Sequence, residues 1–373
     1  MKLLRLYIQG SGIFNHTLID FTHEGKPQDL LCLAGVNGSG KTTVMELLFH
    51  LVILLTPTLS LQSIFFDRLK PHIFTRTKFA QLDVLIDEKI LSLVIGEKSN
   101  MVRDESNPAQ AFIIESELGS LISRFEDMVV KIPEDDKESS TSIDNEIKRL
   151  IDTERFSKRH VERLNIDIFQ PLLQQIETAL SDKNQTPREG EDLPSIYFFN
   201  AHDREIQDIR YSSIPQEKPK YQLARRYHPR RDDLNKMLVY NDYAYPKRFE
   251  VLKEWVNQHV LVDKHIFEID RPNFKAKIRT KNGNTHGLEL LSSGEESLLI
   301  LAIQIHQKVS RGSVVVIDEV DQSLHPEFQE KVMVLLTQLQ KDKGGQIIVS
   351  SHSDIVWDFF KSKGFIDLTE MVM

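Results

Sequence analysis

The stretch Gly35-Val36-Asn37-Gly38-Ser39-Gly40-Lys41-Thr42 decides the fold of this chain. It matches the pattern G-x-x-x-x-G-K-[ST] of a phosphate-binding loop at every fixed position. The apolar residues 30–34 before it are typical of a buried strand, and residues 43–49 after it are typical of a helix. Because this motif requires a strand, a glycine-rich loop and a helix in that order, the sequence predicts a phosphate-binding loop here.

The residue types in this loop explain how it would hold a nucleotide. Glycines let successive backbone N–H groups point at one phosphate, and the N-terminal end of the following helix adds a positive dipole. Lys41 would place its charge on the β- and γ-phosphates of ATP, and the Thr42 hydroxyl would ligate Mg²⁺. The alternative is a glycine-rich turn that binds nothing. The residues predicted to contact ATP are Asn37, Gly38, Ser39, Gly40, Lys41, Thr42 and Thr43.

Composition restricts the class of protein and its compartment. The chain has 373 residues, of which 40% are hydrophobic and 27% charged, so it is a globular protein of one large or two ordinary domains. At a net charge of −8, a nucleic-acid surface would have to be local. Its single cysteine, Cys32, excludes a disulfide framework and is expected to pack in the core. The apolar run 47–55 is too short to span a bilayer, so we expect a cytoplasmic protein without a membrane partner.

A second motif lies in the C-terminal half, where residues 290–296 read Leu-Leu-Ser-Ser-Gly-Glu-Glu before a helical apolar pattern. Ser292 or Ser293 would cap this helix, and two glutamates would fall in its first turn. One interpretation is simply a well-capped helix. The other is a signature loop whose serine hydroxyl, backbone amides and helix dipole meet a γ-phosphate held by another subunit. The residues of this predicted contact are Ser293, Gly294 and Glu295.

Residues 314–319, Val-Val-Val-Ile-Asp-Glu, predict a buried strand that ends in two carboxylates. Two carboxylates at that position would be costly without a cation. Asp318 therefore suits the Mg²⁺ shell, and Glu319 suits the catalytic base that activates water. A further predicted core strand, residues 346–351, ends at His352, whose neutral ring could bond the γ-phosphate or the attacking water. A histidine in this place could also be purely structural.

Together these motifs resemble the ABC-type ATPase superfamily, in that family's order along the chain. The clade resembled is that of soluble SMC, RecF and OLD-type ATPases, because residues 318–326 are similar to its Asp-Glu-x-x-x-x-Leu-His-Pro form. They depart from it at Val320 and Asp321, where many members have Pro-Glu. The resemblance covers roughly residues 1–96 and 195–360 and implies an ATP- and Mg²⁺-dependent head-to-tail homodimer. ATP would then lie between the phosphate-binding loop of one protomer and Ser293 of the other.

The expected fold class is α/β, a P-loop NTPase of ABC-ATPase type. It would have a mainly parallel core sheet, an antiparallel β subdomain and a helical insertion. The three expected parts are an N-terminal ATPase lobe (1–96), a helical insertion (97–194) and a C-terminal ATPase lobe (195–373). Residues 78–86 and 90–95 predict a hairpin in the first lobe, and the apolar spacings in 143–151 and 168–176 predict helices in the insertion.

Three other features have two interpretations each. Gln81 could reach Mg²⁺ or the attacking water, or be an ordinary strand residue. Arg204 follows a predicted core strand and could contact a phosphate, or pair with a neighbouring carboxylate. The basic window 218–231 could hold a phosphate backbone, or be quenched by the aspartates that follow it.

The biological output is expected to come from a separate protein. Only 21 residues follow His352, and the insertion is too short for an SMC-length arm. Stand-alone AAA-family ATPases of this appearance resemble those of bacterial anti-phage defence systems, which are paired with a nuclease or toxin. The leading hypothesis is thus an ATP-driven sensor and regulator of such an effector. The alternative is a RecF- or SMC-like ATPase that binds DNA directly in repair or maintenance. The Ser-Ser-Gly-Glu-Glu sequence at 292–296 argues against a transporter subunit. The absence of an N-K-x-D motif argues against a GTPase.

Overall fold

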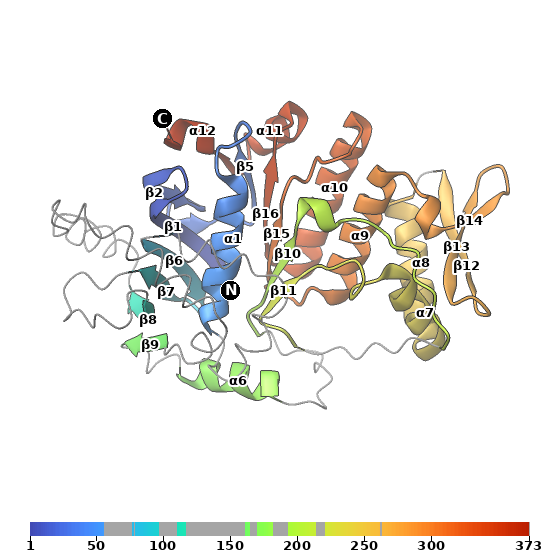
Figure 1. Ribbon diagram of the computed structural model, residues 1–373, viewed down its shortest axis with the longest axis horizontal. Coiled ribbons are helices and arrows are strands. Elements are labelled where there is room, and N and C mark those ends of the chain that lie inside the picture. Colours follow the sequence, from blue (N-terminus) through green and yellow to red (C-terminus); the bar gives the residue numbers. More distant parts are fainter. Residues whose placement is uncertain are drawn as a thin grey trace, which may run out of the picture.

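The computed structural model describes residues 1–55, 77, 79–96, 110–116, 161–164, 170–181, 193–213, 221–261 and 263–372. Figure 1 shows two β-sheets on either side of α1, with a group of helices and a small third sheet beyond the second of them. The elements up to residue 200 are β1 (Lys2–Ser11), β2 (Phe14–Asp20), β3 (Thr22–His23), β4 (Lys26–Pro27), β5 (Leu30–Ala34), α1 (Lys41–Val52), η1 (Ile53–Leu55), β6 (Phe79–Ile86), β7 (Lys89–Gly96), β8 (Gln110–Ser116), β9 (Val161–Leu164), α6 (Gln170–Ser181) and β10 (Ile196–Phe199). The later ones are η4 (Ala201–Asp203), β11 (Ala224–Arg226), α7 (Leu234–Ala244), α8 (Pro246–His259), β12 (Lys264–Asp270), β13 (Lys275–Thr280), β14 (Thr285–Gly287), η5 (Leu288–Leu290), α9 (Ser293–Lys308), β15 (Val314–Ile317), α10 (Pro326–Lys343), β16 (Gln346–Ser351), α11 (Asp354–Phe360), β17 (Phe365–Asp367) and α12 (Leu368–Val372).

The central sheet is parallel and buried on both faces. Among the described residues its strand order is β11-β10-β15-β16-β5-β17. The register sets Leu31, Ile348, Val316 and Phe198 in one row across four strands, and all four side chains pack in the cluster that contains α1. The next row along the strands is Cys32, Val349, Ile317 and Phe199, and it packs in the cluster of α7–α10. Since successive side chains alternate between faces, a strand buried on both sides is a continuous apolar run, as the sequence predicts.

The N-terminal sheet covers the other side of α1. Its order over the described residues is β2-β1-β6-β7-β8-β9, antiparallel except for the β8–β9 pair. Helix α1 contacts β6 and β7 on one side and β10 and β15 on the other. The predicted hairpin is confirmed, because β6 pairs with β7 through a turn at Asp87 and Glu88, both in the left-handed region.

The part of the chain expected to be a helical insertion contains more than helix. Helix α6 lies where the apolar spacing of residues 168–176 predicts one. Strands β8 and β9 were not predicted, and β8 hydrogen-bonds along β7, so it extends the N-terminal sheet. The predicted helix over 143–151 lies outside the described residues. Short apolar runs do not by themselves tell strand from helix, which is why sheet pairing decided these segments.

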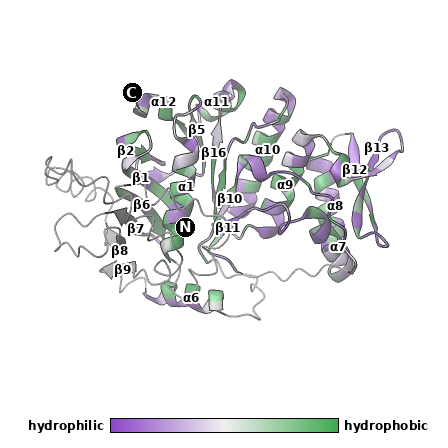
Figure 2. Ribbon diagram, in the orientation of Figure 1, coloured by the Kyte–Doolittle hydropathy of each residue, from purple (hydrophilic) through white to green (hydrophobic). Residues whose placement is uncertain are grey.

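Helices α9 and α10 cover the second face of the parallel sheet, α8 packs against α9, and α7 and α8 pack on β12 and β13. Figure 2 shows hydrophobic and hydrophilic residues mixed along α10, as expected for a helix with one buried side, whereas α9 is buried on all sides from Ser297 to Ile305. The antiparallel sheet β12-β13-β14 lies at their outer end (Figure 1). Cys32 is fully buried, as expected for core packing. Among the described helices, none combines the length and the apolar character that crossing a bilayer requires.

Candidate nucleotide site

Neighbouring parallel strands bring the predicted site residues to one edge of the central sheet. The segments that follow β5, β16, β15 and β10, in this spatial order, carry Thr42, His352, Asp318 and Arg204. The carboxyl ends of parallel strands lie at the same edge, and ligands of open α/β sheets bind there. The strand order therefore explains why residues far apart in the sequence meet.

The phosphate-binding loop has the curled backbone that its glycines permit. Gly40, just before α1, has φ +83°, and a Cβ there would lie 2.4 Å from the Phe14 ring. Gly35 has φ +147°, and a Cβ there would lie 2.4 Å from Ser39 Oγ. Both positions thus exclude larger residues on conformational and steric grounds. In this loop Val36, Asn37 and Gly38 are exposed, whereas Ser39 and Lys41 are buried; Thr42 and Thr43 are half-buried in the first turn of α1.

The Lys41 ammonium points back into the loop. Nζ donates to the carbonyl of Gly35 at 2.7 Å, to that of Val36 at 2.9 Å and to Ser39 Oγ at 3.3 Å. Burial lowers the pKa of Lys41, and the nearby carboxylates of Glu319, Asp318 and Asp321 oppose that shift. A partly desolvated cation inside a ring of backbone groups is suited to an anionic ligand.

Asp318 links the phosphate-binding loop to the strand behind it. Its Oδ2 accepts from the Thr42 hydroxyl at 3.0 Å, and its Oδ1 accepts from the Ser350 hydroxyl at 2.6 Å. Ser350 was not predicted as a site residue. The signal was present, because a hydroxyl within a buried strand needs a hydrogen-bonding partner. Thr42 is half-buried and Asp318 is buried, and their side-chain oxygens are adjacent. Such oxygens are the hard ligands that Mg²⁺ prefers.

Glu319 and His352 face each other across the same edge. His352 Nε2 lies 3.5 Å from Glu319 Oε1, and His352 Nδ1 lies 3.3 Å from Lys41 Nζ. Because Lys41 can only donate, Nδ1 must accept, and the proton of a neutral ring sits on Nε2 facing Glu319. The His352 backbone N–H contacts Asp321 Oδ2 at 3.4 Å. The predicted catalytic residues are thus brought together by the fold.

Arg204 lies inside this carboxylate cluster and not on the surface. Its Nη2 donates to the Glu319 carbonyl at 2.5 Å, and 7% of the residue is exposed. Burial lowers the pKa of Arg204 to about 10, opposed by Asp318, Asp321 and Glu319, so the group is charged at neutral pH. Among the described residues Arg204 forms no close ion pair with Asp203, Glu205 or Asp208, the last of which pairs with Lys275, so the expected pairing with a neighbouring carboxylate is wrong.

The predicted signature segment forms the N-terminus of α9. Ser292 is the N-cap, and it forms a capping box with Glu295. Burial would raise the pKa of Glu295, but the Lys264 ammonium at 2.6 Å and bonds from Ser292 outweigh burial and lower it. Ser293 is exposed, and among the described residues no hydrogen bond joins this segment to the phosphate-binding loop of the same chain. A Cβ on Gly294 would lie 3.3 Å from the Ser323 carbonyl, so the helix start packs against the loop after Asp321.

Gln81 does not join the group described above. Its amide donates to Asp83 at 2.9 Å and to Ser92 at 3.2 Å within the N-terminal sheet, and the residue is buried. The side chain is occupied as that of an ordinary strand residue, the second of the two interpretations. Nothing in the sequence around Gln81 indicated its hydrogen bonds to Asp83 and Ser92.

The described part of the basic window, residues 221–231, divides into arginines held by carboxylates and one that is not; Lys218 and Lys220 lie outside the described residues. Arg225 and Arg231 pair with Asp232, and Arg226 makes a two-pronged contact with buried Glu46 on α1. The aspartate that follows the window does quench it, as one interpretation held. In contrast, Arg230 bonds the neutral Gln207, and it has no ion pair among the described residues.

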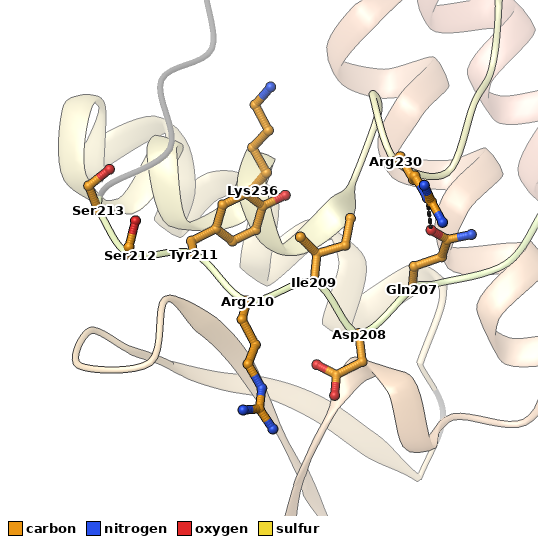
Figure 3. A pocket seen from close by; sticks show the side chains of 9 residues that line it. All are labelled: Gln207, Asp208, Ile209, Arg210, Tyr211, Ser212, Ser213, Arg230 and Lys236. Atoms are coloured by element: carbon orange, nitrogen blue, oxygen red, sulfur yellow. Dashed lines mark hydrogen bonds between the residues drawn. The ribbon is translucent and has the colours of Figure 1, made fainter.

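A polar hollow of about 800 Å³ adjoins these arginines, lined by residues 207–213 together with Arg230 and Lys236. Figure 3 shows Arg230 beside Gln207, with Arg210 and Lys236 pointing to opposite sides. Within the described part of the chain, no close ion pair involves Arg210, Arg230 or Lys236, although Arg210 attracts Asp208 and Lys236 attracts Asp233 electrostatically. None of the residues that line the hollow belongs to the phosphate-binding loop, so this is a surface distinct from the candidate nucleotide site.

This fold and this edge define a P-loop ATPase-type nucleotide-binding protein. Residues 30–358 match the family described as "AAA domain, putative AbiEii toxin, Type IV TA system", and the chain belongs to that family. Comparison with curated proteins finds no significant match.

Solved structures similar to this chain include SMC head domains. That from Thermotoga maritima is 14% identical, with a TM-score of 0.43, and the comparison covers 96% of this chain and 92% of that one. An SMC head bound to the C-winged helix domain of ScpA is 13% identical, with a TM-score of 0.45 and coverages of 95% and 91%. An SMC head with an extended coiled coil, bound to the C-terminal domain of ScpA derived from Pyrococcus furiosus, is 13% identical, with a TM-score of 0.40 and coverages of 95% and 90%. At these scores, they support no inference about activity or partners.

Proposed function

We propose that the chain binds Mg-ATP at the edge described above, hydrolyses it, and does so as a head-to-tail homodimer. The observation that carries this is the convergence of Lys41, Thr42, Asp318, Glu319 and His352 from three separate strands. A bound Mg²⁺ would supply charge neutralisation on the β- and γ-phosphates. Thr42 and Asp318 would hold it, and Ser350 fixes the Asp318 carboxylate.

The roles of the other residues follow from their contacts. The loop amides and Lys41 would bind the phosphates. Glu319 would accept the proton of the attacking water, and the Nε2–H of His352 would steady either that carboxylate or the γ-phosphate. The exposed Ser293 and the amides at the start of α9 would seal the triphosphate of the partner subunit. We keep the division into 1–96, 97–194 and 195–373 as part of this proposal.

A mixing experiment tests whether the site is shared between two copies. Lys41→Ala destroys the phosphate-binding half and Ser293→Arg blocks the sealing half. Each homodimer then has two defective sites. A mixed dimer would combine the intact loop of the Ser293→Arg chain with the intact Ser293 of the Lys41→Ala chain. We expect each variant alone to be inactive. In the mixture, each heterodimer has one intact site out of two, so it should regain up to about half the activity of a wild-type dimer.

The controls for this experiment use the same proteins. Mixing Lys41→Ala with Glu319→Gln should restore nothing, because both defects fall on the same half: one site keeps its loop but lacks Glu319, and the other lacks Lys41. Full activity of Ser293→Arg alone would remove Ser293 from the site. Failure of the two halves to complement, with heterodimers demonstrated by tag exchange, would show that no shared site exists.

We further propose that this ATPase regulates a separate effector, a nuclease or toxin, in bacterial anti-phage defence. The family description, which names a toxin of a type IV TA system, supports a setting with a second component. The test is co-expression with the product of the adjacent gene, followed by phage plating and by isolation of the pair with and without ATP. Protection that requires both proteins, and is lost with Lys41→Ala, is expected. A chain that binds no neighbour and leaves plating unchanged would contradict the role.

The alternative is direct binding of nucleic acid, and one observation favours a particular surface for it. Arg210, Arg230 and Lys236 form no close ion pair within the described residues, whereas Arg225, Arg226 and Arg231 are held by carboxylates. A triple charge reversal of the unpaired group should weaken duplex binding steeply and reduce its salt dependence. Reversal of the exposed Lys281 is the matched control. Unchanged binding in the triple variant would exclude this surface.

A further inference from the structure

Arg204 is held in place by the peptide that carries the predicted catalytic base. Its Nη2 donates to the carbonyl of Glu319, and the N–H of the same Glu319 donates to Ser350 Oγ at 2.7 Å. The Glu319 carbonyl thus accepts from Arg204, which follows η4, and from the backbone N–H of Gln322, while its N–H is bound by Ser350 on β16. Glu319 has φ +46°, a left-handed conformation that is rare for a glutamate and is maintained only by its surroundings.

The same guanidinium supplies the charge that a cluster of carboxylates needs. Asp318, Glu319 and Asp321 all act on Arg204 electrostatically, and Arg204 itself is almost fully buried. Three anions gathered at one sheet edge repel one another and lose hydration. A fixed, always-charged group behind them offsets both costs, and arginine is suited to this because burial rarely removes its charge.

Arg204 also has bonding capacity left over. Its Nε and Nη1 are buried and have no partner within the described part of the chain, and Asp321 Oδ1 is in the same condition. Simple ion pairing would have used these donors. The side chain instead directs one donor to a backbone carbonyl, which places the constraint on the Glu319 backbone and leaves the carboxylate of Glu319 free to face His352.

We propose that Arg204 is a positioning residue for hydrolysis, which holds the Glu319 peptide in its left-handed conformation and keeps the carboxylate cluster together. This inference rests on the proposed ATPase activity, and Arg204 acts through Glu319 without touching ATP. It assigns a purpose to a residue that the sequence suggested only as a phosphate contact or a surface ion pair.

The kinetic test separates positioning from binding. Arg204→Met keeps the length of the side chain without its charge. We expect kcat to fall about 10- to 100-fold, less than the roughly 10²- to 10⁴-fold that a base itself contributes, because Glu319 is misplaced but still present, while KM for ATP stays within about threefold. In Arg204→Ala, millimolar guanidinium should restore part of kcat, which a role in packing alone would not allow. Arg271→Met, a change of the same chemistry at an exposed position, should leave kcat unaltered.

A second measurement does not depend on turnover. Amide hydrogen exchange of the peptide that contains Glu319 should be at least about tenfold faster in Arg204→Met, with exchange in α1 unchanged. If the wild-type protein hydrolysed no ATP, the proposed function would be refuted. The hydrogen-exchange measurement would still decide whether Arg204 holds the Glu319 backbone. Wild-type kcat in Arg204→Met, unchanged exchange at Glu319, or joint loss of ATP affinity and global stability without rescue would each overturn the assignment.

Discussion

The hydroxyl of Thr42 donates to the carboxylate of Asp318 over 3.0 Å, across 276 positions of sequence. Thr42 lies in the first turn of α1, and Asp318 directly follows β15. One strand separates β5 from β15 in the sheet: β16 lies between them and contributes Ser350 to the same carboxylate. Two oxygen ligands are thus already adjacent, so a cation would not have to assemble them.

The first prediction concerns nucleotide affinity. Lys41→Ala removes the ammonium that fills the phosphate-binding loop. Charged hydrogen bonds contribute about 1.5–3 kcal/mol each, so losing contacts to two phosphates should weaken ATP binding by at least about 100-fold. Titration calorimetry measures this, and Lys281→Ala serves as the matched surface control. ATP affinity equal to that of the unchanged protein would disprove the phosphate-binding role of the loop.

The second prediction concerns Glu319→Gln, which keeps the shape of the side chain but cannot accept a proton. Removal of a general base should slow hydrolysis by about 10²- to 10⁴-fold while ATP still binds. With binding intact and turnover blocked, the protein should elute as a dimer in ATP and as a smaller species without it. Glu327→Gln, on the exposed start of α10, should behave as wild type. Normal turnover in Glu319→Gln would remove Glu319 from its role.

The third prediction is a pH dependence that originates at Glu296. Burial raises the pKa of Glu296 to about 7, and Glu205 adds to the shift, while a bond from the Ile206 backbone opposes it. The folded protein thus keeps a proton that the unfolded chain releases above its ordinary pKa of 4.5. The stability from this proton is fully present below about pH 4.5 and is lost as the pH rises through about 7.

The variant Glu296→Gln is neutral at every pH and tests this relation. Relative to wild type, it should gain unfolding free energy between pH 5 and pH 8, by about 1 kcal/mol, because the half-buried site is partly screened by solvent. Urea unfolding at the two pH values measures the difference. Glu330→Gln at an exposed site of α10 should show no such change. Equal effects in both variants would show that Glu296 is not the source.

The fourth prediction concerns Arg226 and Glu46. Burial would raise the pKa of Glu46, but bonds from His50 and Arg226 outweigh it and lower this pKa to about 2. Arg226 also lies 4.6 Å from the Phe198 ring centre, so it belongs to the core between α1 and β11. Arg226→Met should reduce stability by about 3 kcal/mol, since it removes the arginine partner of a buried carboxylate and leaves only His50 beside it among the described residues.

The stability difference between the wild type and Arg226→Met should also depend on pH in a defined direction. The stability that Glu46 contributes is present above about pH 4.5 and is lost as the pH falls through about 2, so the wild-type advantage over Arg226→Met should shrink below pH 4.5. Arg271→Met is the control for a change at an exposed arginine. If Arg226→Met were as stable as the wild type and bound duplex more weakly, Arg226 would be a nucleic-acid contact and not a core residue.

The parts of the fold that the sequence alone could predict are those determined by residues adjacent in the chain. The strand at 30–34, the loop and the start of α1 are adjacent residues, and so are the cap and first turn of α9. The hairpin of β6 and β7 is also local. Strands β8 and β9 were missed because pairing partners, not propensity, make them strands.

The sequence by itself determined the chemistry available to this protein: a glycine loop with Lys41 and Thr42, a helix capped by Ser292 or Ser293, and a strand that ends in two carboxylates. Each depends on neighbours within a few positions, where backbone geometry and hydrogen bonding follow from residue type. Only the tertiary structure decided that Ser350 and Arg204 belong to the same site, and that Arg226 belongs to the core. Strand order set those contacts, because which strands lie side by side depends on the burial of whole sheet faces and not on any local pattern.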